Sequence, residues 1–260
     1  MVDCNVGLGH WPFARFGSVS ASRLDRELAD LGVSTALVWN PEAVLYEEPE
    51  ACNTDLARRV ARYPRLLPVP VANPRVRSAE SIVAQPGIPA VRLVPNYHAY
   101  RLTDDVAVAL CRRAAARRLP VIVQMRVEDE RNQYELLKVP GVPVDEVEAL
   151  AARLPELTIV AVCGYLREVI RLAAVPNVWL DISFAETVDT LGALKAEIGL
   201  AKLLLGSHAP WLYARAAMAK VETGTITAVE RNAVGGKTAG RLFRLRRLPP
   251  DAGRAGTRAG

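Results

Sequence analysis

The sequence predicts an α/β protein that forms one (β/α)8 barrel of the TIM type, with a distorted ring left open as a variant. Short runs of Val, Ile, Leu and Ala alternate along the chain with amphipathic helical stretches, as in parallel sheets covered by helices on both faces. Eight such runs can be counted, and the length of 260 residues suits one barrel domain. A doubly wound sheet is the alternative, but no Gly-rich phosphate loop follows the first run.

The expected strands are the apolar runs, the first of which opens the chain: residues 2–7, 33–39, 66–71, 90–94, 121–125, 157–162, 178–182 and 202–206. The expected helices lie between the runs, and several open on Ser or Asp, which are common helix caps: residues 22–31, 55–63, 104–118, 144–154 and 166–173. Two segments are predicted to be loops, a surface excursion at 41–53 and a longer polar loop at 127–143.

Composition and charge indicate the extent of the domain and limit the classes of partner. Residues 1–247 are expected to form the barrel, and residues 248–260 a basic, disordered tail without core-forming side chains. Six arginines and one aspartate in residues 241–260 account for the net charge of +5, so the body is neutral and carries no nucleic-acid footprint. No apolar run reaches the length of a membrane helix, and we expect a cytoplasmic protein. A homo-oligomer is left open.

The four cysteines are scattered along the chain, at Cys4, Cys52, Cys111 and Cys163, without Cys-x-x-Cys spacing. This scatter argues against a zinc ribbon and gives no disulfide framework. Cys4 and Cys163 lie in strand-like runs, where buried free thiols are common, so a structural role is favoured over a catalytic one.

The first strand carries polar residues on one face. With a side-chain period of two, Asp3, Asn5 and Gly7 lie on the face opposite to Cys4 and Val6. A carboxylate and an amide on one face of a buried strand must find partners or hold a ligand. This strand is therefore a candidate wall of a functional site.

The same alternation predicts a polar mouth at the carboxyl ends of the strands, where barrels carry their functional residues. The polar residues expected to face the barrel interior are Asp3, Asn5, Arg92, Gln124, Arg126 and His208. Arginine forks suit a substrate carboxylate. The alternative, weighed equally, is an interior held by Arg–Asp pairs in which Asp3 forms an ion pair with Arg92.

All three histidines follow predicted strands: His10 follows the first, His98 the fourth and His208 the eighth. We expect at least two of them to line one pocket. Tyr100 ends a stretch after the fourth strand that is dense in aromatic and charged side chains, and Asp129 lies among the carboxylates that follow the fifth strand. These two residues are candidates for a binding group and a base.

Three motifs resemble the amidohydrolase-related family of TIM barrels over roughly residues 1–245. The first strand of that family reads Asp-x-His-x-His-Leu-Gly, whereas residues 3–9 here read Asp-Cys-Asn-Val-Gly-Leu-Gly. The second motif is Arg-Leu-Val-Pro at residues 92–95. The third is Gly-Ser-His-Ala-Pro at residues 206–210, where the family reads Gly-Ser-Asp-x-Pro.

The resemblance implies a barrel whose inherited metal ligands are largely replaced. Asn5 and Gly7 occupy the positions of the two first-strand histidines of the family. Gln124 occupies the position of a fifth-strand histidine, and Val162 aligns with the histidine of a sixth-strand His-x-Gly. His208 replaces the aspartate that serves the family as metal ligand and general base. A catalytic Zn²⁺ site needs about three protein ligands, so no metal or other cofactor is expected. A new metal site formed by His10, His98 and His208 is a less favoured alternative.

Two functions remain open, and the enzyme is favoured. The resemblance implies a metal-free hydrolase of a small, carboxylate-bearing lactone or amide, with decarboxylation less favoured. His208 and Asp129 would transfer protons. The substrate-binding residues would be Asp3, Asn5, His10, Arg92, His98, Tyr100, Gln124 and Arg126. The alternative is a non-catalytic barrel that binds a small anionic ligand or acts as a scaffold.

Overall fold

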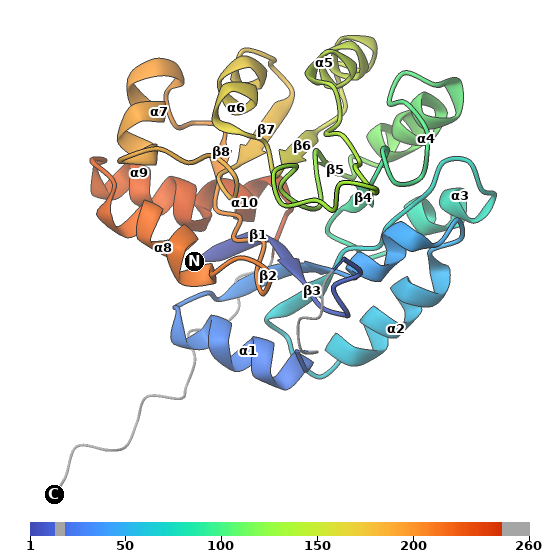
Figure 1. Cartoon of the computed structure of the whole chain (residues 1–260), viewed down its shortest axis with the longest axis horizontal. Helices are drawn as coiled ribbons and strands as arrows, with labels where there is room; N and C mark the ends of the chain where they lie inside the picture. The colour runs from blue at the N-terminus through green and yellow to red at the C-terminus, as the bar shows by residue number, and fades with distance from the viewer. Residues whose placement is uncertain (14–18, 246–260) are drawn as a thin grey trace, which may run out of the picture.

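The computed structural model describes residues 1–13 and 19–245, in which eight parallel strands form a ring surrounded by helices (Figure 1). The predicted tail, residues 248–260, lies outside the described residues. The strands are β1 (Val2–Gly7), β2 (Thr35–Trp39), β3 (Leu66–Pro68), β4 (Val91–Leu93), β5 (Val121–Gln124), β6 (Ile159–Val162), β7 (Val178–Asp181) and β8 (Leu203–Leu204). They start or end within a few residues of the predicted apolar runs.

The ring closes at two joints, and at each joint a single β-bridge connects the two sheets. Strands β1 to β3 pair in one parallel sheet and β4 to β8 in another. One bridge joins Val71 to Arg92, and a second joins Val6 to Ala209. At the second joint the backbone N–H of Gly7 also donates to the carbonyl of Ala209 at 2.7 Å. The predicted (β/α)8 barrel is confirmed, with irregular pairing at both joints.

The helices follow one another in chain order, most of them on the outside of the ring (Figure 1). They are α1 (Ala21–Asp30), α2 (Glu50–Val60), α3 (Ser78–Ala84), α4 (Asp105–Ala116), α5 (Val144–Arg153), α6 (Leu166–Ala173), α7 (Thr190–Ile198), α8 (Ala214–Thr223), α9 (Ala228–Asn232) and α10 (Thr238–Leu242). In the part of the chain that the structure describes, no helix combines the length and apolar character needed to cross a membrane.

The predicted surface excursion at 41–53 is wrong. A 3-10 helix, η1 (Pro41–Leu45), buries Ala43 and Val44 in a cluster with the tryptophan that ends β2. Helix α2 then begins at Glu50, five residues before the predicted start, with Pro49 ahead of it and an acidic residue in the first turn. Both features favour a helix start, because proline fixes the backbone angle and a carboxylate complements the helix dipole.

The predicted alternation holds in β4, β5 and β8. Val91, Val123 and Leu203 lie in the large apolar core cluster, whereas Ile122 and Leu204 lie in the small cluster formed by the opposite sides of the strands.

Strand β1 departs from this alternation. Its pairing with β2 shifts register between Asp3 and Val6. Cys4 therefore packs in the small cluster and Val6 in the large one, although a regular strand would place them on one face.

Candidate functional site

Two amides and one arginine form the centre of the barrel mouth. Nη1 of Arg92, from β4, donates to Oδ1 of Asn5 at 3.3 Å and also to Oε1 of Gln124. Because a guanidinium only donates, it orients both amides with their NH₂ groups away from it. Nδ2 of Asn5 and Nε2 of Gln124 then each donate to Sγ of Cys163 at 3.2 Å. Amides from β1 and β5, both oriented by Arg92 of β4, thus converge on the thiol that follows β6.

The same thiol faces a histidine. Sγ of Cys163 lies 3.5 Å from Nδ1 of His208, and Oγ of Ser183 donates to Sγ at 3.5 Å. Nε2 of His208 lies 2.9 Å from the carbonyl oxygen of Val127. A carbonyl only accepts, so Nε2 carries the proton and Nδ1 presents its lone pair to the thiol.

Burial sets the ionisation of this pair. It lowers the pKa of His208 to about 4 and raises the pKa of Cys163 to about 12, so both side chains are neutral at pH 7. Their backbones have φ values of +56° and +60°, a left-handed conformation that is uncommon outside glycine. Such conformations are often found at functional sites.

Two buried carboxyls flank the network. Oδ2 of Asp181 accepts from Nδ2 of Asn5 at 2.9 Å, and Oδ1 accepts from the backbone N–H of Cys163 at 2.8 Å. Oδ1 of Asp3 accepts from the backbone N–H groups of Asn5 at 3.1 Å and Ser207 at 3.0 Å. Burial raises the pKa of Asp3 to about 7 and also raises that of Asp181.

Asp3 therefore does not form the ion pair with Arg92 that the alternative predicts. The backbone of β1 and the residue before His208 occupy one oxygen of Asp3, and the other oxygen has no partner among the described residues. Asn5 instead links Arg92 to Asp181, because its carbonyl accepts from one and its NH₂ donates to the other.

Arg92 is incompletely satisfied. Its side chain is fully buried, and its guanidinium carbon lies 4.6 Å from the centre of the Trp39 ring. Within the described residues, Nε and Nη2 have no hydrogen-bond partner. Burial lowers the pKa to about 10, which still leaves the group charged at pH 7. A buried cation with two free donors marks a place for an acceptor.

Aromatic side chains cover this centre. The rings of Trp11, Phe184 and Trp211 lie 5.6–5.8 Å from the ring of His208, which is 2% exposed. Trp11 and Trp211 stack on each other at 4.7 Å. A Cβ atom at Gly7 would lie 1.7 Å from Cζ3 of Trp211, so the indole occupies the space that a side chain at position 7 would need.

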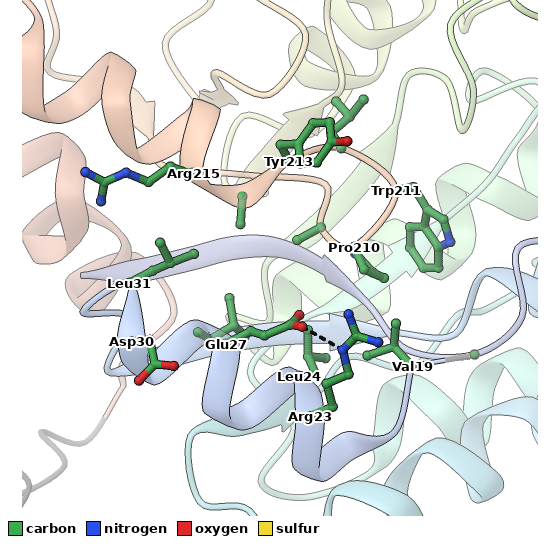
Figure 2. A pocket seen from close by; sticks show the side chains of 15 residues that line it. Val19, Arg23, Leu24, Glu27, Asp30, Leu31, Pro210, Trp211, Tyr213 and Arg215 are labelled. Atoms are coloured by element: carbon green, nitrogen blue, oxygen red, sulfur yellow. Dashed lines mark hydrogen bonds and ion pairs between the residues drawn. The ribbon is translucent and has the colours of Figure 1, made fainter. Parts of the chain in front are cut away.

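A groove lies beside this cover (Figure 2). Its volume is about 580 Å³, and it is lined by residues of α1 and by residues 209–215. Trp211 is one of its walls and also contacts the ring of His208. The same indole therefore borders both the groove and the barrel centre.

Arg126 reaches the mouth, but its donors are already used. Nη1 and Nη2 donate to the two oxygens of Glu168 at 2.7 and 2.6 Å. Nη1 also donates to the carbonyl of Cys163 at 2.6 Å, and the guanidinium stacks on Tyr165 at 3.8 Å. The arrangement indicates that Arg126 stabilises the loops after β5 and β6, rather than binding substrate as the sequence predicts.

Asp129 does not contact the central thiol or imidazole. Its carboxylate pairs with Arg131 at 2.6 Å and accepts from the hydroxyl of Tyr165 at 3.0 Å. The hydrogen bonds from Arg131 lower its pKa to about 2, which makes it a weak base at neutral pH. The predicted catalytic role of Asp129 therefore has no support in its surroundings.

The remaining predicted residues lie apart from His208. His10 is exposed, and Nε2 of His98 lies 3.0 Å from the carbonyl oxygen of Ala43 in η1. Tyr100 packs in the large apolar cluster. No contact among the described residues joins either of the other histidines to His208.

The sequence reading missed the contributions of Asp181 and Ser183 and undervalued Cys163. Asp181 is a single acid at the end of an otherwise apolar strand, and this pattern could have revealed it. The role of Cys163 had no such signal. The predicted alignment assigned the sixth-strand position to Val162, which packs in the small apolar cluster, while the left-handed backbone at Cys163 turns the thiol toward Asn5 and Gln124.

Comparison with known proteins identifies the family. Residues 2–245 match the family described as amidohydrolase, which is nearly the whole described chain. The chain belongs to the amidohydrolase family. Comparison with curated proteins finds none that matches.

Solved structures of this amidohydrolase fold are similar over almost their full length. A dihydroxybenzoic acid decarboxylase from a Polaromonas species, with bound manganese and 2-nitroresorcinol, is 16% identical, with a TM-score of 0.73 over 95% of this chain and 97% of that one. A 2,6-dihydroxybenzoate decarboxylase from Rhizobium is 15% identical, with a TM-score of 0.71 over 94% and 98%. An amidohydrolase from Bifidobacterium longum subsp. infantis is 16% identical, with a TM-score of 0.66 over 95% and 100%.

The donors at the centre of this barrel do not fit a metal ion. A guanidinium holds the oxygens of Asn5 and Gln124, and the NH₂ groups of both amides point at sulfur. Amides are weak ligands beside histidine or carboxylate. The indole of Trp211 fills the space at Gly7. Across residues 1–13 and 19–245, no group of three His, Cys, Asp or Glu side chains is placed to hold a metal.

Proposed function

We propose that this chain is a metal-independent hydrolase of the amidohydrolase family that acts on a small lactone or amide bearing an anionic group. The observation that supports it best is the buried, charged guanidinium of Arg92, which has two free donors beside Asn5 and Gln124. These are two of the positions at which the resemblance expects metal ligands. An arginine there supplies a positive charge without a metal.

The residues of the centre have complementary roles in this proposal. Nε and Nη2 of Arg92 bind the anionic group or polarise the carbonyl oxygen, and charge-assisted hydrogen bonds of this kind are among the strongest in proteins. His208 is neutral at pH 7 and presents Nδ1 as a base. Asp181 and Asn5 hold the network in place, because each hydrogen-bonds the other and a third member.

A second candidate is the non-catalytic barrel. It is favoured by the closure of the centre, where Arg92, Asn5 and His208 are buried behind aromatic side chains. In this case the free donors of Arg92 hold a small anion that stabilises the barrel, and no bond is broken. The two candidates share the anion contact and differ in turnover.

The test compares small lactones and amides in pairs, each with and without a carboxylate, in the presence of EDTA. Turnover should favour the carboxylate-bearing member at least about tenfold, because one charge-assisted hydrogen bond contributes about 1.5–3 kcal/mol. The preference should disappear in Arg92→Met. The control Arg113→Met removes an exposed ion pair with Glu80 on the outside of the barrel, and it should keep the preference.

The outcomes separate the candidates. Turnover that requires added metal would contradict the proposal. Absence of turnover, together with an anion-dependent rise in Tm that Arg92→Met abolishes, would favour the non-catalytic barrel. Because Arg92→Met leaves two amide oxygens without their donor, its melting temperature is measured alongside.

A further inference from the structure

Cys163 has four hydrogen-bonding contacts through its sulfur. Three are donors that point at it, from Asn5 and Gln124 at 3.2 Å and from Ser183 at 3.5 Å. The fourth is Nδ1 of His208, whose proton lies on the other ring nitrogen. The single thiol hydrogen therefore has one acceptor to point to. Burial has the larger effect on the pKa of Cys163 and raises it, whereas the hydrogen bonds from Ser183 and Asn5 favour negative charge on sulfur and lower it.

We propose that Cys163 is the nucleophile of this site and His208 its general base, an inference that rests on the proposed hydrolase function. Nucleophile, base and orienting group form a chain, because the carbonyl of Val127 fixes the tautomer of the imidazole that faces the thiol. The same logic of a nucleophile with an oriented base recurs on unrelated folds.

The other buried cysteines show that this environment is specific. All four cysteines lie in the described chain and are free and buried. Cys4 packs in the small apolar cluster of the barrel, and Cys111 packs in the large one. An ordinary buried thiol is surrounded by apolar side chains. Cys163 instead has a base and three polar donors.

A second observation points to a reacting carbonyl beside the thiol. Arg92 is fully buried and has two free donors, and the amides that it orients are the ones that donate to Sγ. A carbonyl compound next to the sulfur would place its oxygen near a fixed positive charge. The charge would stabilise the oxyanion that forms when sulfur attacks.

The covalent step balances without any further reactant except water. Nδ1 of His208 takes the thiol proton as sulfur bonds to the carbonyl carbon of the ester or lactone. The carbon–oxygen bond to the leaving group then breaks, and the leaving oxygen takes the proton from His208. Water attacks the resulting thioester, with His208 again accepting a proton, and the collapse returns the thiol and releases a carboxylic acid.

Access to the sulfur requires the aromatic cover to move. Cys163 is fully buried. Trp211 lines the groove beside α1 (Figure 2), and its ring lies 5.7 Å from the ring of His208. Shortening Trp211 should therefore open a route from the groove to the thiol.

The test uses an activated ester, p-nitrophenyl acetate, with the full-length protein in EDTA at pH 7. Intact-protein mass spectrometry after acid quench should show one acetyl group, and peptide mapping should place it on Cys163. Cys163→Ala should lack this adduct, whereas Cys4→Ala, which truncates an equally buried thiol, should retain it. His208→Asn should slow acetylation about 10²–10⁴-fold, and its melting transition, recorded alongside, shows whether the variant is folded. Trp211→Ala should accelerate it.

The outcomes distinguish this inference from the function on which it rests. An adduct on Cys163 supports the nucleophile even if none of the lactones and amides turns over. Turnover that is retained in Cys163→Ala would contradict the nucleophilic role of Cys163, whereas the proposed hydrolase function would still hold. Acetylation of other residues but not of Cys163, in both wild type and Trp211→Ala, also overturns it.

Discussion

Asp3 and His208 are buried on either side of the joint between β1 and β8, and burial shifts their pKa values in opposite directions. The pKa of the carboxyl rises to about 7, and that of the imidazole falls to about 4. The two groups are linked through the backbone, because Asp3 accepts from the N–H of Ser207 and the N–H of His208 donates to the carbonyl of Asn5 at 2.8 Å. Both groups are therefore neutral in the folded protein between about pH 4 and pH 7.

This opposition predicts that two variants depart from the wild type in the pH dependence of their stability, and in opposite directions. Between pH 4 and 6.5 the unfolded imidazole binds more protons than the folded one, so this group alone makes stability rise with pH. The folded carboxyl binds more protons than the unfolded one, so it alone makes stability fall with pH. The two contributions, about 3 and 4 kcal/mol in full, largely cancel.

The free energy of unfolding in urea at pH 4.5 and 6.5 tests this cancellation. Relative to wild type, Asp3→Asn should lose about 2–3 kcal/mol on acidification, because the contribution of the Asp3 carboxyl, which offsets that of the histidine, is removed. His208→Asn should gain about 2 kcal/mol on acidification for the converse reason. Identical pH dependence in all three proteins would contradict the pKa assignments.

Gly7→Ala should destabilise the protein by about 1–3 kcal/mol, because the new methyl group overlaps the indole of Trp211. In a double-mutant cycle with Trp211→Leu, the two changes should be coupled by at least about 0.5 kcal/mol, since the smaller side chain makes room. Gly240→Ala is the matched control, because nothing lies within 4 Å of its Cβ position. Additive losses would show that Trp211 does not fill this space.

Arg126→Met should cost about 2–4 kcal/mol of unfolding free energy, because it leaves the carbonyl of Cys163 without its donor and Glu168 without its paired cation. Arg171→Met removes an exposed arginine that pairs with Asp145 and Glu148, and it should cost less than about 1 kcal/mol. Comparable losses in the two variants would indicate that Arg126 is free to serve another role.

Removing or adding divalent metal should leave the melting temperature unchanged. A site of micromolar affinity would stabilise the folded state by about 4 kcal/mol at about 1 mM Mn²⁺, so its effect would be plain. Thermal unfolding with EDTA and with Mn²⁺, together with the metal content of protein purified without chelator, is the measurement. One equivalent of tightly held metal, lost on His208→Asn, would refute the claim that these donors do not fit a metal.

The barrel could be predicted because its signals are local. Apolar runs separated by amphipathic helices define the strands, and the period of two correctly assigned the opposite sides of β4, β5 and β8. The first strand escaped this rule because its register shift reverses the direction of Val6 relative to Cys4, and such a shift leaves no mark in composition. Segment 41–53 escaped because it holds only a five-residue 3-10 helix and the first turn of α2, which are too short to show a helical period.

The candidate site was only partly predictable. Alternation placed Asn5, Arg92, Gln124 and His208 together, as the structure does. It could not show that Arg126 has its donors filled by Glu168, because that partner lies on another βα unit.

The surroundings of Cys163 could not be predicted for a similar reason. The side chain of a residue just past a strand depends on one backbone angle, and the positive φ of Cys163 determines where its sulfur points. Proximity in space and left-handed backbone are properties of the folded chain rather than of any sequence window.

Trp211 belongs to two walls at once, that of the groove and that of the barrel centre. A molecule that binds in the groove and displaces the indole would change the affinity of the centre for its own ligand. Thermodynamic reciprocity then requires the ligand of the centre to change the affinity of the groove by the same factor. The coupling free energy between two binding events would reside in one side chain, and Trp211→Ala would make them independent.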